Sequence, residues 1–151
     1  MIQFGFSVKR LSFSPRAVLD ATERGTRRVL IRFGAFVRRT ARQSIRKSKK
    51  ISQPGRPPKS RIGHLKRLIF FSYDFGPPSV VIGPALFRST KVKQFPLGLE
   101  ALEYGGSIRR RRRFSLLTKR IVFKARPFMG PALEKELPKL TGLWRDSIVA
   151  R

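Results

Sequence analysis

The chain of 151 residues contains no cysteine and only one histidine, His64. Without cysteine it can form neither a disulfide framework nor a thiolate metal site. A single histidine cannot build a histidine-based metal site within one chain. We interpret His64 as a solvated loop residue in preference to a catalytic one, and we expect neither a metal nor a cofactor.

Acidic residues are also scarce: 8 Asp and Glu stand against 35 Lys and Arg, for a formal net charge of +27. No two of these acids have the spacing of a metal or acid–base pair. Glu134 and Glu136 are two residues apart and would point away from each other on a helix. The phosphate-binding patterns G-x-x-x-x-G-K-[ST] and G-x-G-x-x-G are absent. We therefore expect a protein that is not an enzyme.

Long apolar runs are absent too. No stretch approaches the ~20 apolar residues that a membrane span needs. The opening "MIQFGFSVKRLSF" lacks the continuous apolar segment of a signal peptide and alternates as a strand does. A chain with this charge attracts polyanions, so nucleic acid is the first expected partner, an acidic protein the second and a membrane surface the third.

What the sequence does contain is enough apolar material for one core. Hydrophobic residues make up 40% of the chain and include thirteen phenylalanines. This composition predicts a single folded domain over residues 1–151.

The first half predicts a strand over 3–13 and a long helix over 15–48, with Ser14 as N-cap and Pro15 in the first turn. Such a helix is about 50 Å long, so it should project, cross a sheet or pack on a neighbouring subunit. Residues 47–63 are rich in proline and basic residues and predict a flexible loop. Residues 64–75 predict a strand, or a short helix that leads into one.

The second half predicts a short strand at Val80–Ile82 and a short helix around Leu97–Tyr104. An arginine-rich hairpin loop over 105–115 and a strand over 115–125 should follow. Leucines spaced by three and four residues then predict a last helix that Pro131 begins and Pro138 kinks or restarts.

These elements define an α+β fold. We expect the long N-terminal helix and the C-terminal helix to pack on a small, mostly antiparallel β-sheet. The predicted core is Phe33, Val37, Ile82, Ile121, Phe123, Phe128, Leu133, Leu137 and Trp144.

Two groups of arginines are candidates for contact with DNA or a protein partner. One lies on the polar side of the long helix and comprises Arg28, Arg32, Arg39, Arg42 and Arg46. The other is the uninterrupted run Arg109, Arg110, Arg111, Arg112 and Arg113. Almost no acid interrupts them, so ion pairs within the helix cannot neutralise them. A polyanion-binding or acidic-protein-binding surface is the favoured interpretation, and a solvated face is the alternative.

Several short motifs follow the long helix in order: "PGRPPKSRIGHLKRLI", Ile82–Gly83–Pro84, "LEYGGS" at Leu102–Ser107 and "ARPFMGPAL" at Ala125–Leu133. This order resembles that of the tail-completion, or head–tail joining, proteins of tailed bacteriophages. The resemblance covers residues 15–148. Two features depart from it: Ile62 stands where the family has threonine, and the charge of the chain is unusual.

Within this resemblance, two motifs are expected to hold the fold together. Arg126 and Pro127 should stop the preceding strand, Phe128 should fill the space between helix and sheet, and Pro131 should start the last helix. Glu103, Tyr104 and Gly105 should end their own segment against that corner.

For function, the resemblance implies a structural virion protein of the phage neck, assembled in the host cytoplasm. Such a subunit would form a homo-oligomeric ring, expected to be a hexamer, between the head connector and the tail-terminator or tail-tube proteins, with DNA in the channel. The arginines would touch packaged DNA or dock on acidic surfaces of adjacent neck proteins. The alternative is a sequence-independent, ribosomal or chromatin-like nucleic-acid-binding protein.

Overall fold

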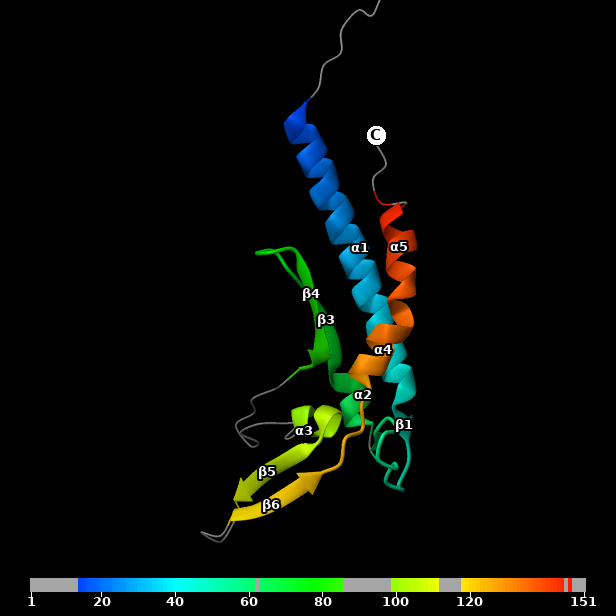
Figure 1. The fold of residues 1–151 in the computed structure, drawn as a ribbon, viewed down its shortest axis with the longest axis vertical. Coiled ribbons are helices and arrows are strands. Elements are labelled where there is room, and N and C mark those ends of the chain that lie inside the picture. Colours follow the sequence, from blue (N-terminus) through cyan, green and yellow to red (C-terminus); the bar gives the residue numbers. More distant parts are fainter. Residues whose placement is uncertain (1–13, 62, 86–98, 112–117, 146, 148–151) are drawn as a thin grey trace, which may run out of the picture.

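A long helix runs through the centre of the molecule. The computed structural model describes residues 14–61, 63–85, 99–111, 118–145 and 147, and helix α1 covers Pro15–Ser44 (Figure 1). Ser14 precedes the helix in an extended conformation, but its side chain makes no capping hydrogen bond. The predicted end at residue 48 is wrong, because Ile45 turns to an extended conformation and is buried. The strand predicted over 3–13 lies outside the described residues.

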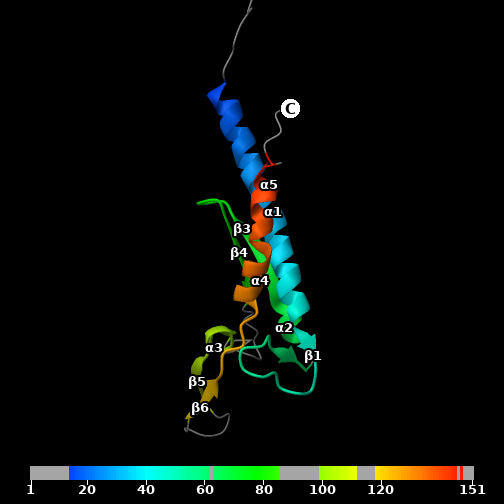
Figure 2. The ribbon, with the colours of Figure 1, turned by 45° about the vertical axis from the view of Figure 1, so that its right-hand side comes forward.

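Two layers cover different sides of α1. Strands β3 (Ile69–Asp74) and β4 (Ser79–Pro84) form an antiparallel hairpin against one side. Helices α4 (Met129–Glu136) and α5 (Pro138–Arg145) pack against another (Figures 1 and 2). Helix α1 therefore lies between a β-hairpin and a helical layer.

The remaining elements gather at the C-terminal end of α1. Helix α2 (His64–Leu68) leads into β3, as one of the two predictions for this segment proposed. Helix α3 (Leu99–Tyr104) precedes β5 (Gly106–Arg111), which pairs with β6 (Thr118–Phe123) in an antiparallel hairpin. Residues Arg46–Lys47 (β1) and Lys59–Ser60 (β2) make a short parallel pair.

The fold is therefore α+β, as the sequence predicts. In the described part of the chain, the strands form three separate two-stranded sheets rather than one continuous sheet, and two of the three are antiparallel.

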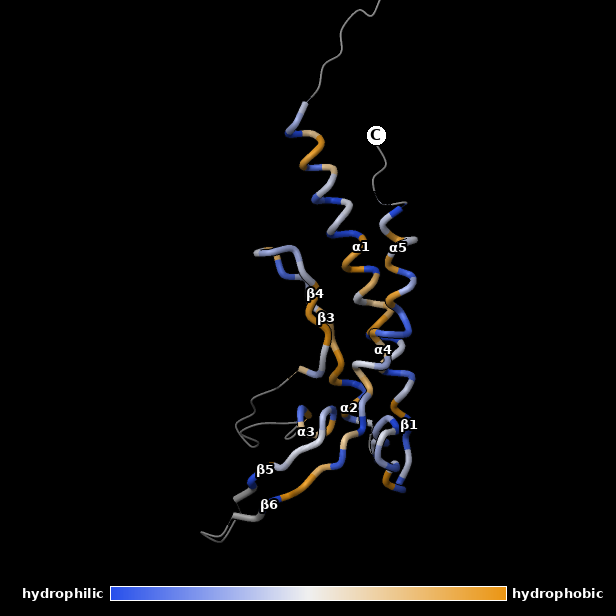
Figure 3. The backbone as a smooth tube through the Cα atoms, in the orientation of Figure 1, coloured by the Kyte–Doolittle hydropathy of each residue, from blue (hydrophilic) through white to orange (hydrophobic). Residues whose placement is uncertain are grey.

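The core forms where α1, β3 and α4 meet. Its buried members come from α1 and the residue that follows it, from the first residue of β3, and from the start of α4. They are Phe33, Val37, Ala41, Ile45, Ile69, Phe128 and Ala132. Figure 3 shows hydrophobic residues along β3 and within α1 and α4. Of the predicted core, Phe33, Val37 and Phe128 are buried, Ile82 packs against the cluster, and Ile121 and Phe123 are half-buried.

The predicted core face of the C-terminal helix is wrong. Leu133 and Leu137 are 40% and 51% exposed, and Trp144 is 36% exposed. The buried face instead carries Ala132 and Glu136. The small Ala132 side chain lets α4 approach α1 closely, whereas two leucines would hold the helices apart.

The C-terminal helix is also divided. Helix α4 ends at Glu136 and α5 begins at Pro138, where the sequence predicts a kink or a restart. Proline has no N–H to continue the helical ladder, and the chain bridges the break with a hydrogen bond from the Leu140 N–H to the Leu137 carbonyl (3.0 Å).

We predict that a side chain larger than hydrogen at Gly34 separates α1 from the β3–β4 hairpin. A Cβ atom there would lie 2.8 Å from a methyl carbon of Val80 and 3.1 Å from the ring of Phe71. Gly34→Val should lower the free energy of unfolding by about 2 kcal/mol through overpacking, as measured by urea denaturation. The control is Gly142→Ala in α5, where the added methyl meets nothing within 4 Å and should stabilise the helix by about 1 kcal/mol. Equal effects of the two substitutions would contradict this packing.

Candidate polyanion-binding surface

The predicted arginine stripe on α1 faces solvent. Arg28, Arg32 and Arg39 are exposed and Arg42 is half-buried. At 100° per residue these positions lie on one side of the helix, opposite the buried Val37. The stripe is therefore the polar face of an amphipathic helix.

Two hollows accompany the stripe. One of about 260 Å³ lies between α1 and α5 and is lined by Arg28, Arg32 and Lys139, among others. A second of about 460 Å³ is lined by Arg38, Arg39, Arg42 and Lys66. The guanidinium of Arg38 is already engaged there, because its Nε donates to the Ile69 carbonyl (2.9 Å) and its Cζ lies 5.6 Å from the Phe70 ring centroid.

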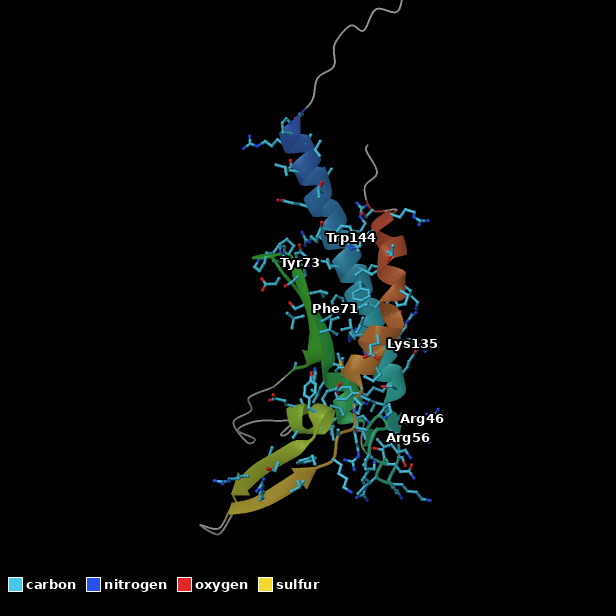
Figure 4. All side chains as sticks on the ribbon, viewed as in Figure 1. Arg46, Arg56, Phe71, Tyr73, Lys135 and Trp144 are labelled. Carbon is cyan, nitrogen blue, oxygen red and sulfur yellow. The ribbon has the colours of Figure 1, made fainter. Side chains whose placement is uncertain are left out.

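A third hollow, of about 650 Å³, lies beyond the end of α1. The segment 46–59 folds around it, and its lining includes Arg46, Lys50, Ser52, Arg56 and Lys59. Figure 4 labels Arg46 and Arg56 side by side at this end of the molecule. The sequence predicted Arg46 as a candidate but treated the rest of this segment as part of a flexible loop over 47–63. Its mobility stays a prediction.

The arginine run begins in a strand, not in a hairpin loop. Arg109, Arg110 and Arg111 belong to β5 and lie opposite Arg120, Lys119 and Thr118 of β6. The predicted loop boundary at residue 105 is therefore wrong. The remaining two residues of the run, Arg112 and Arg113, lie outside the described residues.

The two arginine groups are not brought together. Figures 1 and 2 show the β5–β6 hairpin extending away from the end of α1, whereas the stripe runs along α1 itself. A ligand that contacts Arg28 as well as the β5 arginines would have to extend along α1 to the β5–β6 hairpin (Figure 1), as a nucleic-acid duplex or a second subunit can.

The two predicted structural motifs meet at one corner. The Glu103 carboxylate accepts hydrogen bonds from the backbone N–H groups of Phe128 (2.9 Å), Met129 (3.1 Å) and Gly130 (2.9 Å). These groups open α4, and the following residue, Pro131, has no N–H. An α-helix leaves the N–H groups of its first four positions, counted from the N-cap, without a partner inside the helix. In α4 three of these N–H groups bind Glu103, and the fourth position has no N–H. Helix α4 begins at Met129, two residues before the predicted start at Pro131.

The same corner is also joined to the segment that contains Ser52. The Arg126 N–H donates to the Leu102 carbonyl (2.7 Å), and the Arg126 Nε donates to the Ser52 carbonyl (3.0 Å). Gly105 has φ +81°, and a Cβ atom there would lie 3.3 Å from the Ala125 nitrogen. Tyr104 is 81% exposed. Among the motif residues, Tyr104 therefore contributes a surface side chain to the corner, and Pro127 is half-buried.

A buried carboxylate links α4 to α1. Thr40 donates a hydrogen bond to Glu136 (2.6 Å), and Lys139 donates another from α5. Hydrogen bonds from Lys139 and Thr40 hold the pKa of the Glu136 carboxyl below its ordinary value of 4.5, although burial opposes this.

Comparisons with protein-family models, curated proteins and solved structures find no match to this chain. Within the described ranges, no helix is both long and apolar enough to cross a membrane, and no group of three His, Cys, Asp or Glu residues could hold a metal ion.

Sequence reasoning missed the basic hollow of segment 46–59. The available signal in the sequence was that Lys50, Arg56 and Lys59 lie close to Ser52. We interpreted these residues only as part of a basic loop. The pairing of Arg46 with Lys59, which closes the segment, carries no recognisable pattern in the sequence.

We predict that Glu103→Ala lowers the free energy of unfolding by about 2–4 kcal/mol, because it leaves three amides at the start of α4 without their acceptor. Urea denaturation measures this loss. Glu134→Ala, at an exposed position of the same helix, is the control and should change stability by less than about 0.5 kcal/mol. An equally small effect at Glu103 would show that water replaces the carboxylate without cost.

Glu136 should make stability depend on pH in a defined direction. Because its folded pKa is lower than the unfolded value of 4.5, the unfolded chain binds the proton first. The contribution is therefore fully present above that value and is lost as pH falls through the folded pKa. The difference in urea midpoint between the natural chain and Glu136→Gln should shrink as pH falls below 4.5. A difference that stays constant from neutral to acid pH would contradict this linkage.

Proposed function

We propose that this chain is a structural, ring-forming subunit of the neck of a tailed bacteriophage. The ring joins the head connector to the tail and surrounds the DNA channel. Packaged DNA and the neighbouring neck proteins are its partners.

The observation that carries this proposal is a pair of different apolar surfaces. The hairpin face comprises Phe70 and Val81, which lie on the outward side of β3 and β4 with exposed fractions of 43% and 64%. The helix face comprises Leu133, Leu137 and Trp144 on α4 and α5. These faces belong to the two layers that α1 separates (Figure 1).

Two unlike faces favour a head-to-tail contact between copies. When one face of each subunit binds the other face of the next, the contact is heterologous, and a suitable rotation closes it into a ring. Burial of the leucines and aromatic rings supplies a favourable free energy that salt does not screen. That matters in a chain with net charge +27, whose copies repel one another.

The charged surface supports the same assembly. The stripe of Arg28, Arg32 and Arg39 faces solvent, where it is free to meet DNA phosphates or an acidic neighbour. Contacts to phosphate do not depend on base sequence, as passage of a whole genome through a channel requires. The order of the sequence motifs supports the family, and the Glu103 corner gives two of them a physical role.

The exposed arginine stripe also favours a second candidate, a sequence-independent nucleic-acid-binding protein. Such a protein needs no ring. Its binding of random duplex DNA would weaken steeply with salt, and its mass would stay that of one chain when DNA is absent.

The ring proposal predicts a specific result when two damaged subunits are mixed. Val81→Glu places a carboxylate on the hairpin face, and Leu137→Glu places one on the helix face. Neither variant should therefore form a ring alone. An equimolar mixture should form a dimer and nothing larger, because only one pair of intact faces remains. Native mass spectrometry at high salt without DNA measures each species.

The matched control is Val122→Glu on β6, the same change at a comparably exposed valine (72%) outside both faces. It should form the same ring as the natural chain. Homodimers of either face variant would contradict a head-to-tail contact. A natural chain that stays monomeric even with isolated connector, yet binds DNA, would favour the second candidate.

A further inference from the structure

We propose that the hollow enclosed by segment 46–59, called here the 46–59 pocket, is a binding site for a phosphate group of a nucleic-acid backbone. The site is built within one chain. This proposal therefore does not depend on whether the chain forms a ring.

The charges around the pocket have one sign. Arg46, Lys50, Arg56 and Lys59 line it, and none of its lining residues is acidic. Arginine offers two parallel N–H groups to a phosphate, and lysine adds a compact positive charge. A phosphate is the common biological anion that this set of donors suits.

The short pair β1–β2 holds two of these cations against each other. Arg46 and Lys59 are partners in the parallel register, and their like charges repel each other. No acidic side chain of the pocket offsets the repulsion. An anion between the two side chains would turn this repulsion into attraction.

An independent sign comes from Ser52. This residue lines the pocket, is only 6% exposed, and its hydroxyl has no hydrogen-bond partner among the described residues. Leaving a buried hydroxyl unpaired costs free energy, so such groups in folded proteins point to a missing partner. Because Ser52 lines the pocket, a phosphate oxygen bound there would be a candidate acceptor for this hydroxyl.

The backbone of the pocket is fixed from outside. The Arg126 Nε donates to the Ser52 carbonyl (3.0 Å), and the Gly55 N–H donates to the Ala125 carbonyl (2.8 Å). These bonds anchor the segment to the Glu103 corner. A site held in place before its ligand arrives loses less conformational entropy on binding.

The size of the pocket favours a phosphate ester over a bare ion. Its volume of about 650 Å³ lies within the roughly 300–1,000 Å³ usual for pockets that hold whole organic ligands. A phosphodiester with part of its sugars fits this space. The other two hollows, beside Arg28 and beside Arg39, have no unpartnered buried hydroxyl among their described lining residues.

The test separates a defined site from the general field of a highly basic chain. Titration calorimetry measures binding of inorganic phosphate and of a short DNA duplex, at constant ionic strength. Ser52→Ala removes the hydroxyl without changing any charge. It should weaken binding of both probes about tenfold and leave the salt dependence of DNA binding unchanged, since that slope counts charges. Arg56→Gln should weaken both and also reduce the slope.

The controls are Ser72→Ala on β3 and Arg24→Gln on α1, which make the same chemical changes at exposed positions outside the pocket. Neither should reduce phosphate binding as the pocket variants do. A phosphate loss confined to the pocket variants without a loss for DNA would overturn the nucleic-acid backbone as the source. Equal losses from Arg24→Gln and Arg56→Gln, or unchanged binding by Ser52→Ala, would overturn the site itself.

Thermal unfolding checks that Ser52→Ala still folds. In phosphate-free buffer its Tm should equal or exceed that of the natural chain, because the substitution removes an unpaired buried group. Added phosphate should then raise its Tm less than it raises that of the natural chain. A lower Tm without phosphate would mean that the hydroxyl already has a structural partner, which would overturn the assignment.

Discussion

The cap that Glu103 places on α4 is the interaction on which the rest of the structure depends. One carboxylate from α3 satisfies the Phe128, Met129 and Gly130 amides, and Pro131 needs no acceptor. This fixes where α4 begins and brings the Phe128 side chain into the core. Because the capping residue is distant in sequence, the cap also fixes α3 and the hairpin that follows it against the C-terminal helices.

Much of this corner could be predicted from sequence. The glycines after Glu103 and the prolines around Phe128 are local signals, because each restricts the backbone in its own way. The long helix could likewise be predicted from its apolar periodicity. The sequence also predicts strands within 64–75 and at Val80–Ile82, although not their pairing as β3 and β4. The pairing of Arg46 with Lys59 could not, because two isolated residues carry no period and their contact depends on how the segment between them folds.

The wrong face of the C-terminal helix has a physical cause. Hydrophobicity alone assigns Leu133 and Leu137 to the core and Glu136 to solvent. The structure reverses this: Glu136 is buried, and hydrogen bonds from Thr40 and Lys139 offset the cost of removing its carboxylate from water. A polar contact between distant residues thus overrides local periodicity, and it leaves two leucines at the surface. In a protein that works as a monomer, such a stripe favours aggregation; in the proposed ring, the next copy would cover it.

Charge and fold are coupled through Arg126. Its backbone N–H holds α3 and its side chain holds the Ser52 carbonyl, so the corner that starts α4 also positions the 46–59 pocket. The pocket gathers like charges on a segment that two hydrogen bonds anchor to the Glu103 corner. Repulsion there raises the free energy of the empty protein, and a bound phosphate removes it. If the pocket binds a DNA phosphate as proposed, the same residues that weaken the isolated chain would stabilise it once DNA is bound.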